Sequence, residues 1–210
     1  MKRRPFLVAA ATGAGLTSTA LRAQGGPVEG REYSKLAQPL AVSAAGKVEV
    51  VEFFGYWCPH CNSFEPTLEP WVKALPAHVA FRRVPVAFRP DQELHQKLYY
   101  AIEALGLLEV LHRKVFAAMH VDRKRLDKEA DIGALAQANG ADGAKLLETM
   151  KSFSVSSKVR QARQLAEGYR VDSVPMIGVH GRFVTSVAQA NGPQQALAVT
   201  EHLIRLAGKA

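Results

Sequence analysis

Residues 48–75 have the sequence VEVVEFFGYWCPHCNSFEPTLEPWVKAL, and this stretch decides the fold. Its beginning, 48–54, is rich in valine and phenylalanine, which favours a buried β-strand. Its end, 62–75, carries apolar residues at helical spacing. Pro59 suits the first position of a helix, because the N–H that proline lacks would find no partner there. The stretch therefore predicts a strand that leads through a tight turn into a helix.

Cys58 and Cys61 are the only cysteines of the chain, and two residues separate them. Two thiols at this spacing can close a disulfide at the start of a helix and exchange two electrons with a partner. Without a third cysteine, the chain alone cannot build a disulfide framework or a four-cysteine zinc site. A redox-silent staple and half of a metal site shared between subunits are the alternatives to thiol–disulfide chemistry.

The predicted helix gives the two cysteines different surroundings. Cys58 would lie at the helix N-terminus, near unpaired N–H groups and the positive end of the helix dipole, and Cys61 one turn deeper. We therefore expect Cys58 to be the exposed nucleophile with a lowered pKa and Cys61 to be the buried resolving thiol. His60 can stabilise the Cys58 thiolate by a hydrogen bond or a positive charge; otherwise it is an exposed turn residue.

The segment EFFGYWCPHC, residues 52–61, resembles the active-site segment of the DsbA family of periplasmic thiol:disulfide interchange proteins. The Pro59–His60 pair between the cysteines is the pattern of that family. Residues 29–36 resemble its N-terminal strand, and residues 173–183 resemble its proline loop and hairpin. The resemblance covers most of the chain after its first residues. It implies that Cys58, Pro59, His60 and Cys61 form the catalytic motif.

The expected fold class is α/β: a thioredoxin fold with an inserted all-helical domain. Periodicity alone supports an α/β chain with a helical middle, and the resemblance supplies the architecture. It places the thioredoxin-like domain at 27–90 and 171–208 and the helical insertion at 91–170. The first insertion helix is expected to be capped by Asp91. After the first strand and helix, the predicted elements are a strand at 81–88, helices at 91–105, 110–120, 127–139, 145–153 and 156–169, strands at 176–180 and 182–186, and a helix at 193–206.

The first 23 residues have the pattern of a cleavable signal peptide. Three basic residues precede an uncharged stretch from Phe6 to Leu21, which is too short and too weakly apolar for a membrane span. Its removal would take away four of the 27 basic residues and none of the 19 acidic ones. The sequence therefore predicts export to the periplasm, an oxidising compartment in which disulfides persist.

The export route is left open by the sequence. Arg3 and Arg4, followed by Pro5, Phe6 and Leu7, resemble a twin-arginine motif, and the low hydrophobicity of the next residues agrees with it. An ordinary basic segment of the general secretory route explains the arginines equally well. Replacing both arginines by lysine should block export in the first case and barely affect it in the second.

Composition argues against several other functions. No basic stripe is interleaved with aromatic residues, so we expect no nucleic-acid partner, and the cluster at 123–125 fits a solvated helix junction. The histidines are scattered without short metal-ligand pairs, so no metal and no cofactor is expected. Structural or surface roles are the expectation for every histidine except His60.

Two kinds of function remain. The favoured one is an oxidoreductase that donates its disulfide to newly exported cysteine-containing proteins through a mixed disulfide at Cys58 and is reoxidised by a DsbB-like membrane protein. The resemblance also favours a monomer. A periplasmic reductase or isomerase is the nearest alternative, although the short stretch before Val48 leaves no room for a dimerisation domain. A non-catalytic module that binds peptides or carries a metal on its two thiolates is the other.

Val174 and Pro175 are expected to bind substrate. In a thioredoxin-like fold this loop packs against the active-site cysteines and offers its backbone to an extended chain. We predict that the Val174–Pro175 peptide bond is cis, since proline makes that isomer accessible. The alternative is an ordinary trans turn between helix and strand.

Glu52 is expected to be a buried acid with a role in catalysis. Both faces of its strand are apolar, and buried carboxylates are rare unless they are paired or functional. Glu52 also matches a buried acid of the DsbA family, six residues before the first cysteine. Burial should raise its pKa, so that it could exchange a proton with Cys61 near neutral pH. The alternative is a structural ion pair with Arg83 on the neighbouring strand.

Overall fold

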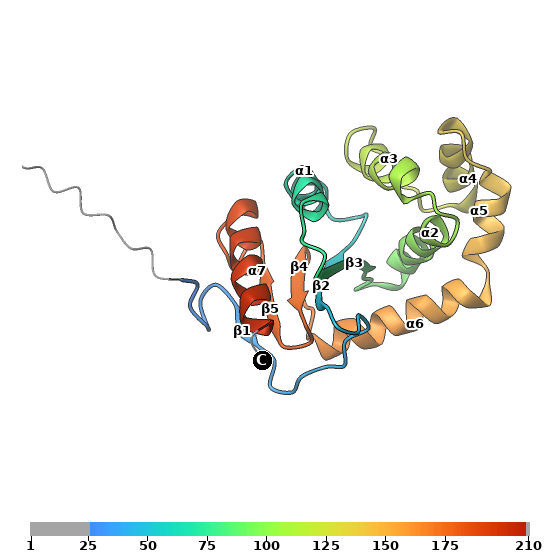
Figure 1. Ribbon diagram of the computed structural model, residues 1–210. Coiled ribbons are helices and arrows are strands. Elements are labelled where there is room, and N and C mark those ends of the chain that lie inside the picture. Colours follow the sequence, from blue (N-terminus) through green and yellow to red (C-terminus); the bar gives the residue numbers. More distant parts are fainter. Residues whose placement is uncertain (1–25, 209–210) are drawn as a thin grey trace, which may run out of the picture.

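The computed structural model describes residues 26–208 and has a mixed five-stranded sheet with helices on both faces (Figure 1). The strand order is β1-β5-β4-β2-β3. The elements in chain order are β1 (Ser34–Lys35), β2 (Val48–Phe54), α1 (Pro59–Lys73), β3 (Val79–Pro85), the 3-10 turn η1 (Pro90–Gln92), α2 (Glu93–Ala104), α3 (Leu108–His120), α4 (Glu129–Ala138), α5 (Gly143–Met150), α6 (Phe153–Gly168), β4 (Met176–Val179), β5 (Phe183–Ser186) and α7 (Pro193–Ala207).

Strand β2 is an interior strand of the sheet, between β4 and the edge strand β3, and is buried along its whole length. It runs parallel to β3 and antiparallel to β4, which forms a hairpin with β5. A strand covered on both faces needs apolar side chains on both, which explains its nearly continuous apolar sequence. Val48 and Val50 pack in one core with α1 and α7, whereas Val51 and Phe53 pack in the core that extends into the inserted helices. The two faces of β2 therefore contribute to different cores, except at the end of the strand, where Phe54 joins the core of Val51 and Phe53.

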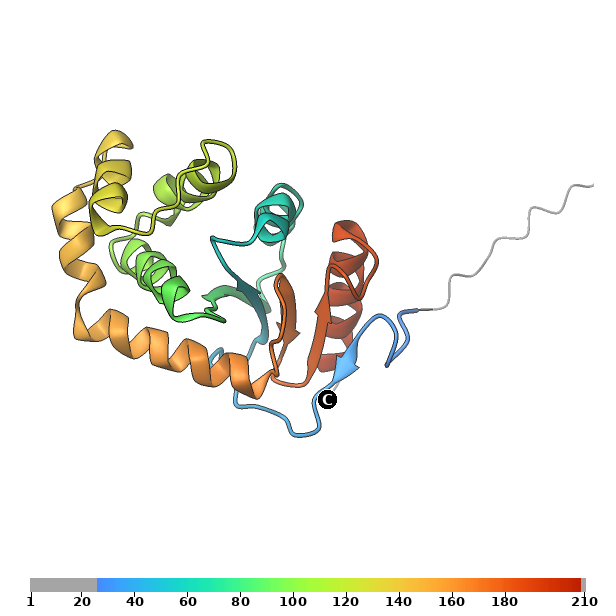
Figure 2. The same ribbon diagram turned by 180° about the vertical axis from the view of Figure 1, so that it is seen from behind.

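Helices α2 to α6 are inserted between β3 and β4, as expected. Figures 1 and 2 show α2 to α5 grouped beside the sheet, with the long helix α6 leading back to it. Helix α4 packs on α5, and α2 packs on both α5 and α6. The apolar core is continuous from Phe53 in the sheet to Phe116 in α3, so the insertion shares its interior with the sheet. The exact domain boundaries, 27–90, 91–170 and 171–208, stay predictions.

Several predicted boundaries are wrong. The N-terminal strand at 29–36 is reduced to Ser34–Lys35, and the strand at 81–88 lies at Val79–Pro85. Asp91 does not cap the first insertion helix, which begins at Glu93. It forms an ion pair with Arg89 instead, while the side chain of Gln92 accepts the backbone N–H groups of Phe88 and Arg89 at 2.8 and 3.1 Å.

Two later helices begin before the predicted positions because of local caps. The Asp142 carboxylate accepts the N–H of Lys145 at 2.9 Å, and the Ser152 hydroxyl accepts the N–H of Val155 at 3.2 Å. Such caps satisfy N–H groups that a helix leaves free in its first turn. Between residues 26 and 208, no helix combines the length and apolar character that a membrane span requires. The predicted signal peptide at 1–23 and its arginines lie outside the described residues.

Tyr169 joins the end of α6 to the sheet. Its ring lies 5.1 Å from that of Phe53, and its hydroxyl accepts the N–H of Gly181 at 2.8 Å. The ring also covers Gly178 in β4, where a Cβ atom would stand 2.4 Å from Cε1 of Tyr169. Glycine at position 178 therefore lets the insertion close against the sheet.

We expect Gly178→Ala to destabilise the protein by about 1–3 kcal/mol, because the added methyl group overpacks a filled core. The measurement is the free energy of unfolding in urea. Gly208→Ala is the matched control, since a Cβ there meets its nearest atom at 3.5 Å, an ordinary contact. Equal stability of the two variants would contradict this account of the junction.

Candidate redox-active site

Cys58 and Cys61 lie where strand β2 leads into α1. Cys58 is the N-cap residue of α1 with an extended backbone, and Pro59 begins the helix, as predicted. The Sγ atom of Cys58 accepts the backbone N–H of Cys61 at 3.4 Å. Both cysteines are free thiols. The turn therefore places two sulfur atoms together at the positive end of a helix.

The expectation that Cys58 is exposed is wrong, since its exposed fraction is 4% against 0% for Cys61. The cover comes from the proline loop, because the Sγ of Cys58 lies 3.5 Å from the carbonyl oxygen of Val174. The predicted cis peptide bond between Val174 and Pro175 is confirmed. The predicted packing of this loop on the cysteines is confirmed as well.

The pKa values of the two thiols are moved in opposite directions. A hydrogen bond from the Cys61 thiol lowers the pKa of Cys58 to about 6, helped by the backbone N–H groups of Cys61 and His60 and by the charge of His60. Burial raises the pKa of Cys61, and the neighbouring Cys58 adds to this effect. Cys58 is therefore the thiolate of the pair at neutral pH.

His60 is exposed and points to a pocket of about 260 Å³ beside the proline loop. The other lining residues of this pocket come from the proline loop and the end of β5: Ser173, Val174, Pro175, Ser186, Val187 and Ala188. The electrostatic contribution of His60 to the thiolate is smaller than that of the backbone N–H groups. The helix terminus thus does more for the Cys58 thiolate than the imidazole does.

Glu52 is completely buried beneath the cysteines, as predicted. Burial and the nearby Glu65 raise its pKa to about 8, although the positive charge of Arg83 opposes this. Arg83 lies opposite Glu52 in the β2–β3 register, and its Nε is 3.0 Å from Oε2 of Glu52. The pairing considered from the sequence is present, but it leaves the carboxyl group neutral at pH 7.

The hydrogen bonds of Arg83 go to another carboxylate. Its Nε donates to Oε1 of Glu65 at 3.3 Å, and its Nη2 donates to Oε2 of Glu65 at 3.0 Å. Among residues 26–208, neither oxygen of Glu52 has a hydrogen-bond partner. Glu65 was not predicted from the sequence as a site residue, although it stands four residues after Cys61 and so on the same helix face.

Helix α3 holds the turn just before Cys58. The Tyr56 hydroxyl lies 2.8 Å from Nδ1 of His112, and the Tyr56 carbonyl oxygen lies 2.7 Å from Nε2 of His120. Next to it, the indole N–H of Trp57 donates to the Val86 carbonyl at 3.4 Å. The inserted helices therefore help to build the site, which no local pattern in the sequence indicated.

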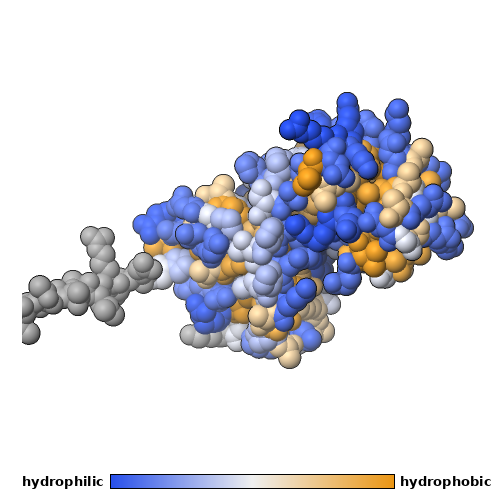
Figure 3. All heavy atoms as spheres, turned by 90° about the horizontal axis from the view of Figure 1, so that it is seen from above, coloured by the Kyte–Doolittle hydropathy of each residue, from blue (hydrophilic) through white to orange (hydrophobic). Residues whose placement is uncertain are grey.

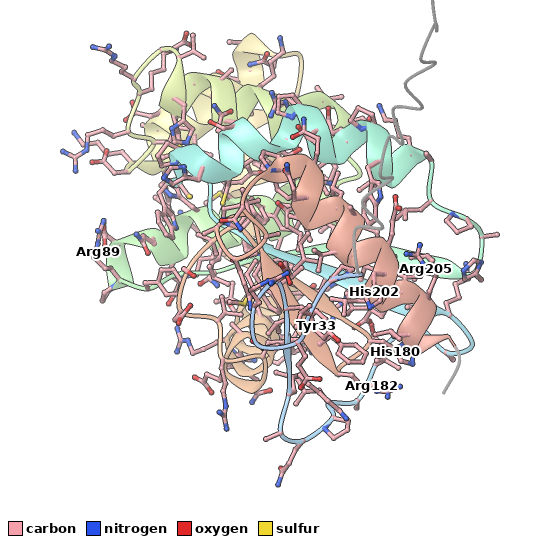
Figure 4. The ribbon with its side chains drawn as sticks, turned by 90° about the vertical axis from the view of Figure 1, so that its left-hand side faces the viewer. Tyr33, Arg89, His180, Arg182, His202 and Arg205 are labelled. Atoms are coloured by element: carbon pink, nitrogen blue, oxygen red, sulfur yellow. The ribbon has the colours of Figure 1, made fainter. Side chains whose placement is uncertain are left out.

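Two other histidines lie at the far end of the sheet, as Figure 4 shows for His180 and His202. His180 faces the backbone N–H of Glu49 at 3.4 Å, and the ring of His202 lies 6.1 Å from that of Tyr33. These contacts agree with the structural or surface role expected for the two histidines. In Figure 3, apolar side chains also show between polar ones on the face seen from above.

An acidic thiol above a buried partner thiol, on a thioredoxin-like sheet, defines a class of protein, the thiol:disulfide oxidoreductases. The family comparisons agree. A family model described as "DSBA-like thioredoxin domain" matches residues 80–198, and one described as "Thioredoxin" matches residues 35–104. The chain belongs to the DsbA family. It is an enzyme with disulfide oxidoreductase activity, and its expected thioredoxin fold with a helical insertion is confirmed.

Relatives and solved structures cover nearly the whole chain. The thiol:disulfide interchange protein DsbA of Bordetella pertussis is 42% identical over 201 residues, 95% of this chain and 94% of its own. The DsbA protein of Pseudomonas aeruginosa is 37% identical over 175 residues, 83% of each chain. The crystal structure of the Pseudomonas aeruginosa protein superimposes with a TM-score of 0.82, covering 86% of this chain and 96% of its own.

We expect the Cys58 thiol to titrate near pH 6 in the reduced protein, far below a free cysteine. Because folding lowers this pKa, the thiolate stabilises the reduced protein fully above about pH 9, and this contribution is lost as the pH falls through about 6. Thiolate absorbance and urea unfolding between pH 5 and pH 9 measure the two effects. Cys58→Ala should remove both transitions, and a midpoint at or above pH 8 would contradict the assignment.

Proposed function

We propose that this protein donates a Cys58–Cys61 disulfide to newly exported proteins that contain cysteine. The observation that carries the proposal is the low pKa of Cys58 beside the raised pKa of Cys61. A thiolate that is stable at neutral pH favours the reduced form of the enzyme. Each pKa unit below the ambient pH contributes about 1.4 kcal/mol, or roughly 30 mV, to the oxidising strength of the disulfide.

The exchange begins when a substrate thiolate attacks Sγ of Cys58. The bond between Cys58 and Cys61 breaks, the substrate sulfur becomes joined to Cys58, and Cys61 leaves with the electron pair. A second substrate thiolate then attacks the substrate sulfur and releases Cys58 as a thiolate. The substrate gains a disulfide, and the enzyme gains two electrons.

Glu52 is the proposed proton donor for Cys61. Burial raises the pKa of Cys61, so this sulfur needs a proton when it leaves the disulfide. Glu52 has a pKa of about 8 and therefore carries a proton at neutral pH. Once Glu52 has lost its proton, its negative charge raises the pKa of Cys61, so the two groups interact electrostatically. Reoxidation would return the proton to Glu52.

The proline loop is the proposed substrate site. The Val174 carbonyl lies 3.5 Å from the Cys58 sulfur, so an extended chain on this loop would bring its own sulfur to Cys58. The pocket beside Pro175 and His60 is open to side chains that flank a substrate cysteine. Its predominantly apolar lining suits unfolded chains, which expose apolar residues.

The setting follows from the predicted signal peptide and from the family. We place the enzyme in the periplasm as a monomer without a cofactor, with export directed by residues 1–23. A DsbB-like membrane protein linked to quinone would reoxidise it. A periplasmic disulfide persists once formed, so donation is the useful direction of exchange in that compartment.

We expect Cys61→Ala to accumulate mixed disulfides, because its Cys58 thiolate attacks a substrate disulfide and expels one substrate sulfur as a thiolate, and no second enzyme thiol then breaks the new bond. Non-reducing electrophoresis of the exported variant, followed by mass spectrometry, identifies the trapped substrates. Cys58→Ala is the matched control and should trap none. Equal trapping by the two variants would show that the roles of the cysteines are assigned wrongly.

We expect Glu52→Gln to slow oxidation of a cysteine peptide by roughly tenfold to a hundredfold below pH 8, because glutamine cannot supply the proton. The ratio of wild-type to variant rates should approach one above pH 8, where Glu52 has lost its proton. Stopped-flow rates from pH 5 to pH 9 give this ratio.

Glu49→Gln is the matched control for that experiment. Glu49 lies on the same strand with 1% exposed and pairs with Arg82 at 3.3 Å, away from the cysteines. Its replacement should leave the shape of the pH profile unchanged. A ratio for Glu52→Gln that stays constant across the pH range would leave Glu52 with a structural role only.

A further inference from the structure

His112 extends the buried charged group beneath the cysteines into the helical insertion. It lies on α3, 4% exposed, and Figures 1 and 2 show this helix beside α1. Its Nε2 is 3.2 Å from Oε1 of Glu65, and its Nδ1 is 2.8 Å from the Tyr56 hydroxyl. A chain of contacts therefore runs from Tyr56 through His112 and Glu65 to Arg83, whose Nε lies 3.0 Å from Glu52.

The chemistry of these groups fixes where the protons lie. Hydrogen bonds from His112 and Arg83 lower the pKa of Glu65 in spite of its burial, so Glu65 is a carboxylate and can only accept. Burial lowers the pKa of His112, so its ring is neutral at pH 7. Nε2 must then donate to Glu65, which leaves Nδ1 to accept the Tyr56 hydroxyl.

The ring of His112 has little freedom to move. It packs against four aromatic rings at centroid distances between 5.2 and 5.9 Å. The four rings come from β2, the turn after it, α2 and α3, and belong to Phe54, Tyr56, Tyr99 and Phe116. A rigid donor aimed at one oxygen of Glu65 holds that carboxylate in a single orientation. The orientation is the one in which Glu65 receives both donor groups of Arg83.

We propose that His112 is a positioning residue for disulfide exchange: it holds Glu65 as the two-point hydrogen-bond partner of Arg83, so that Glu52 has Arg83 as an ion-pair partner at 3.0 Å but receives no well-aligned N–H from it. Without His112, Glu65 would lose a donor and bind Arg83 less well. The Nε–H of Arg83, whose nitrogen already lies 3.0 Å from Oε2 of Glu52, would then align with Glu52, whose oxygens lack hydrogen-bond partners among the described residues. The inference rests on the proposed proton transfer from Glu52 to Cys61.

Other ionisable groups lie near His112, Glu65, Arg83 and Glu52 and can also affect the pH profile. The charge of Glu69 on α1 raises the pKa of His112. Tyr99 on α2 interacts with Arg83 and Glu52. The charge of Cys58 raises the pKa of Glu52, and the charge of Glu52 raises the pKa of Cys61. None of these is changed by a substitution at position 112, so a shift in the pH profile reports on Glu65, Arg83 and Glu52.

The test is the pH profile of peptide oxidation by His112→Phe, which keeps an aromatic ring but removes both hydrogen bonds. We expect the transition assigned to Glu52, near pH 8 in the wild type, to move down by about one pH unit, the effect of one hydrogen bond to a charged group. His112→Gln retains an N–H donor for Glu65 and should restore the wild-type transition. Tyr56→Phe removes only a hydroxyl group and should give a smaller shift in the same direction.

Two controls separate this route from a general effect. His95→Phe replaces another buried histidine of the insertion, 7% exposed and bonded to the Leu126 carbonyl at 3.2 Å, and should leave the profile unchanged. The double variant with Glu52→Gln should have the profile of Glu52→Gln alone, because His112 acts only through Glu52. If His112→Phe does not fold, the pH profiles of Tyr56→Phe and of its double variant with Glu52→Gln test the proposal instead.

The outcomes are distinct. A profile that His112→Phe leaves in place, or that moves equally without Glu52, overturns the positioning role while the proposed function stands. A profile that Glu52→Gln itself leaves unchanged overturns the proton transfer, whatever His112 does. A shift that requires Glu52 and is absent from His95→Phe supports the proposal.

Discussion

The site depends on the burial of both faces of β2, because each carboxyl group on this strand must either have its charge compensated or stay neutral inside the protein. Glu49 and Glu52 illustrate two ways of meeting that constraint. Glu49 accepts hydrogen bonds from Arg82 and Ser43 and keeps its charge, with a lowered pKa. Glu52 has a cation at 3.0 Å but no hydrogen bond in the described part of the chain, and it keeps its proton. One strand thus carries a charged carboxylate and a neutral one.

The difference between the two glutamates is decided on neighbouring elements. Arg83 is opposite Glu52 in the sheet, but its Nε and Nη2 donate hydrogen bonds to Glu65 on α1. A buried carboxyl group next to a cation would otherwise have its pKa lowered. The proton on Glu52 therefore depends on the competition between two carboxylates for one guanidinium group, and α1 provides the one that succeeds.

The sequence predicted the parts of the site that are local. A strand, a turn and a helix place Cys58, Pro59 and Cys61, and the pattern of apolar residues places Glu52 inside the sheet. The cis bond before Pro175 followed from the family resemblance. Glu65 could have been found from its spacing to Cys61, since residues four apart share a helix face.

What the sequence could not predict comes from contacts between distant segments. The cover on Cys58 comes from a loop 116 residues away, so helix position alone suggested too much exposure. The contact of His112 with Glu65 spans 47 residues and depends on how the insertion packs. The predicted helix starts were wrong where a polar side chain caps the helix, as Asp142 and Ser152 do. Several polar residues lie near each start, and the sequence does not show which of them is the cap.

The two contacts between α3 and Tyr56 have a consequence for the motions of the protein. His112 binds the hydroxyl end of this residue and His120 its carbonyl end, so α3 holds both the side chain and the backbone just before Cys58. Local unfolding proceeds in cooperative units that follow such contacts rather than the order of the chain. We therefore expect the amides of the turn before Cys58 and of α3 to open together in hydrogen exchange, separately from those at the distant end of the sheet.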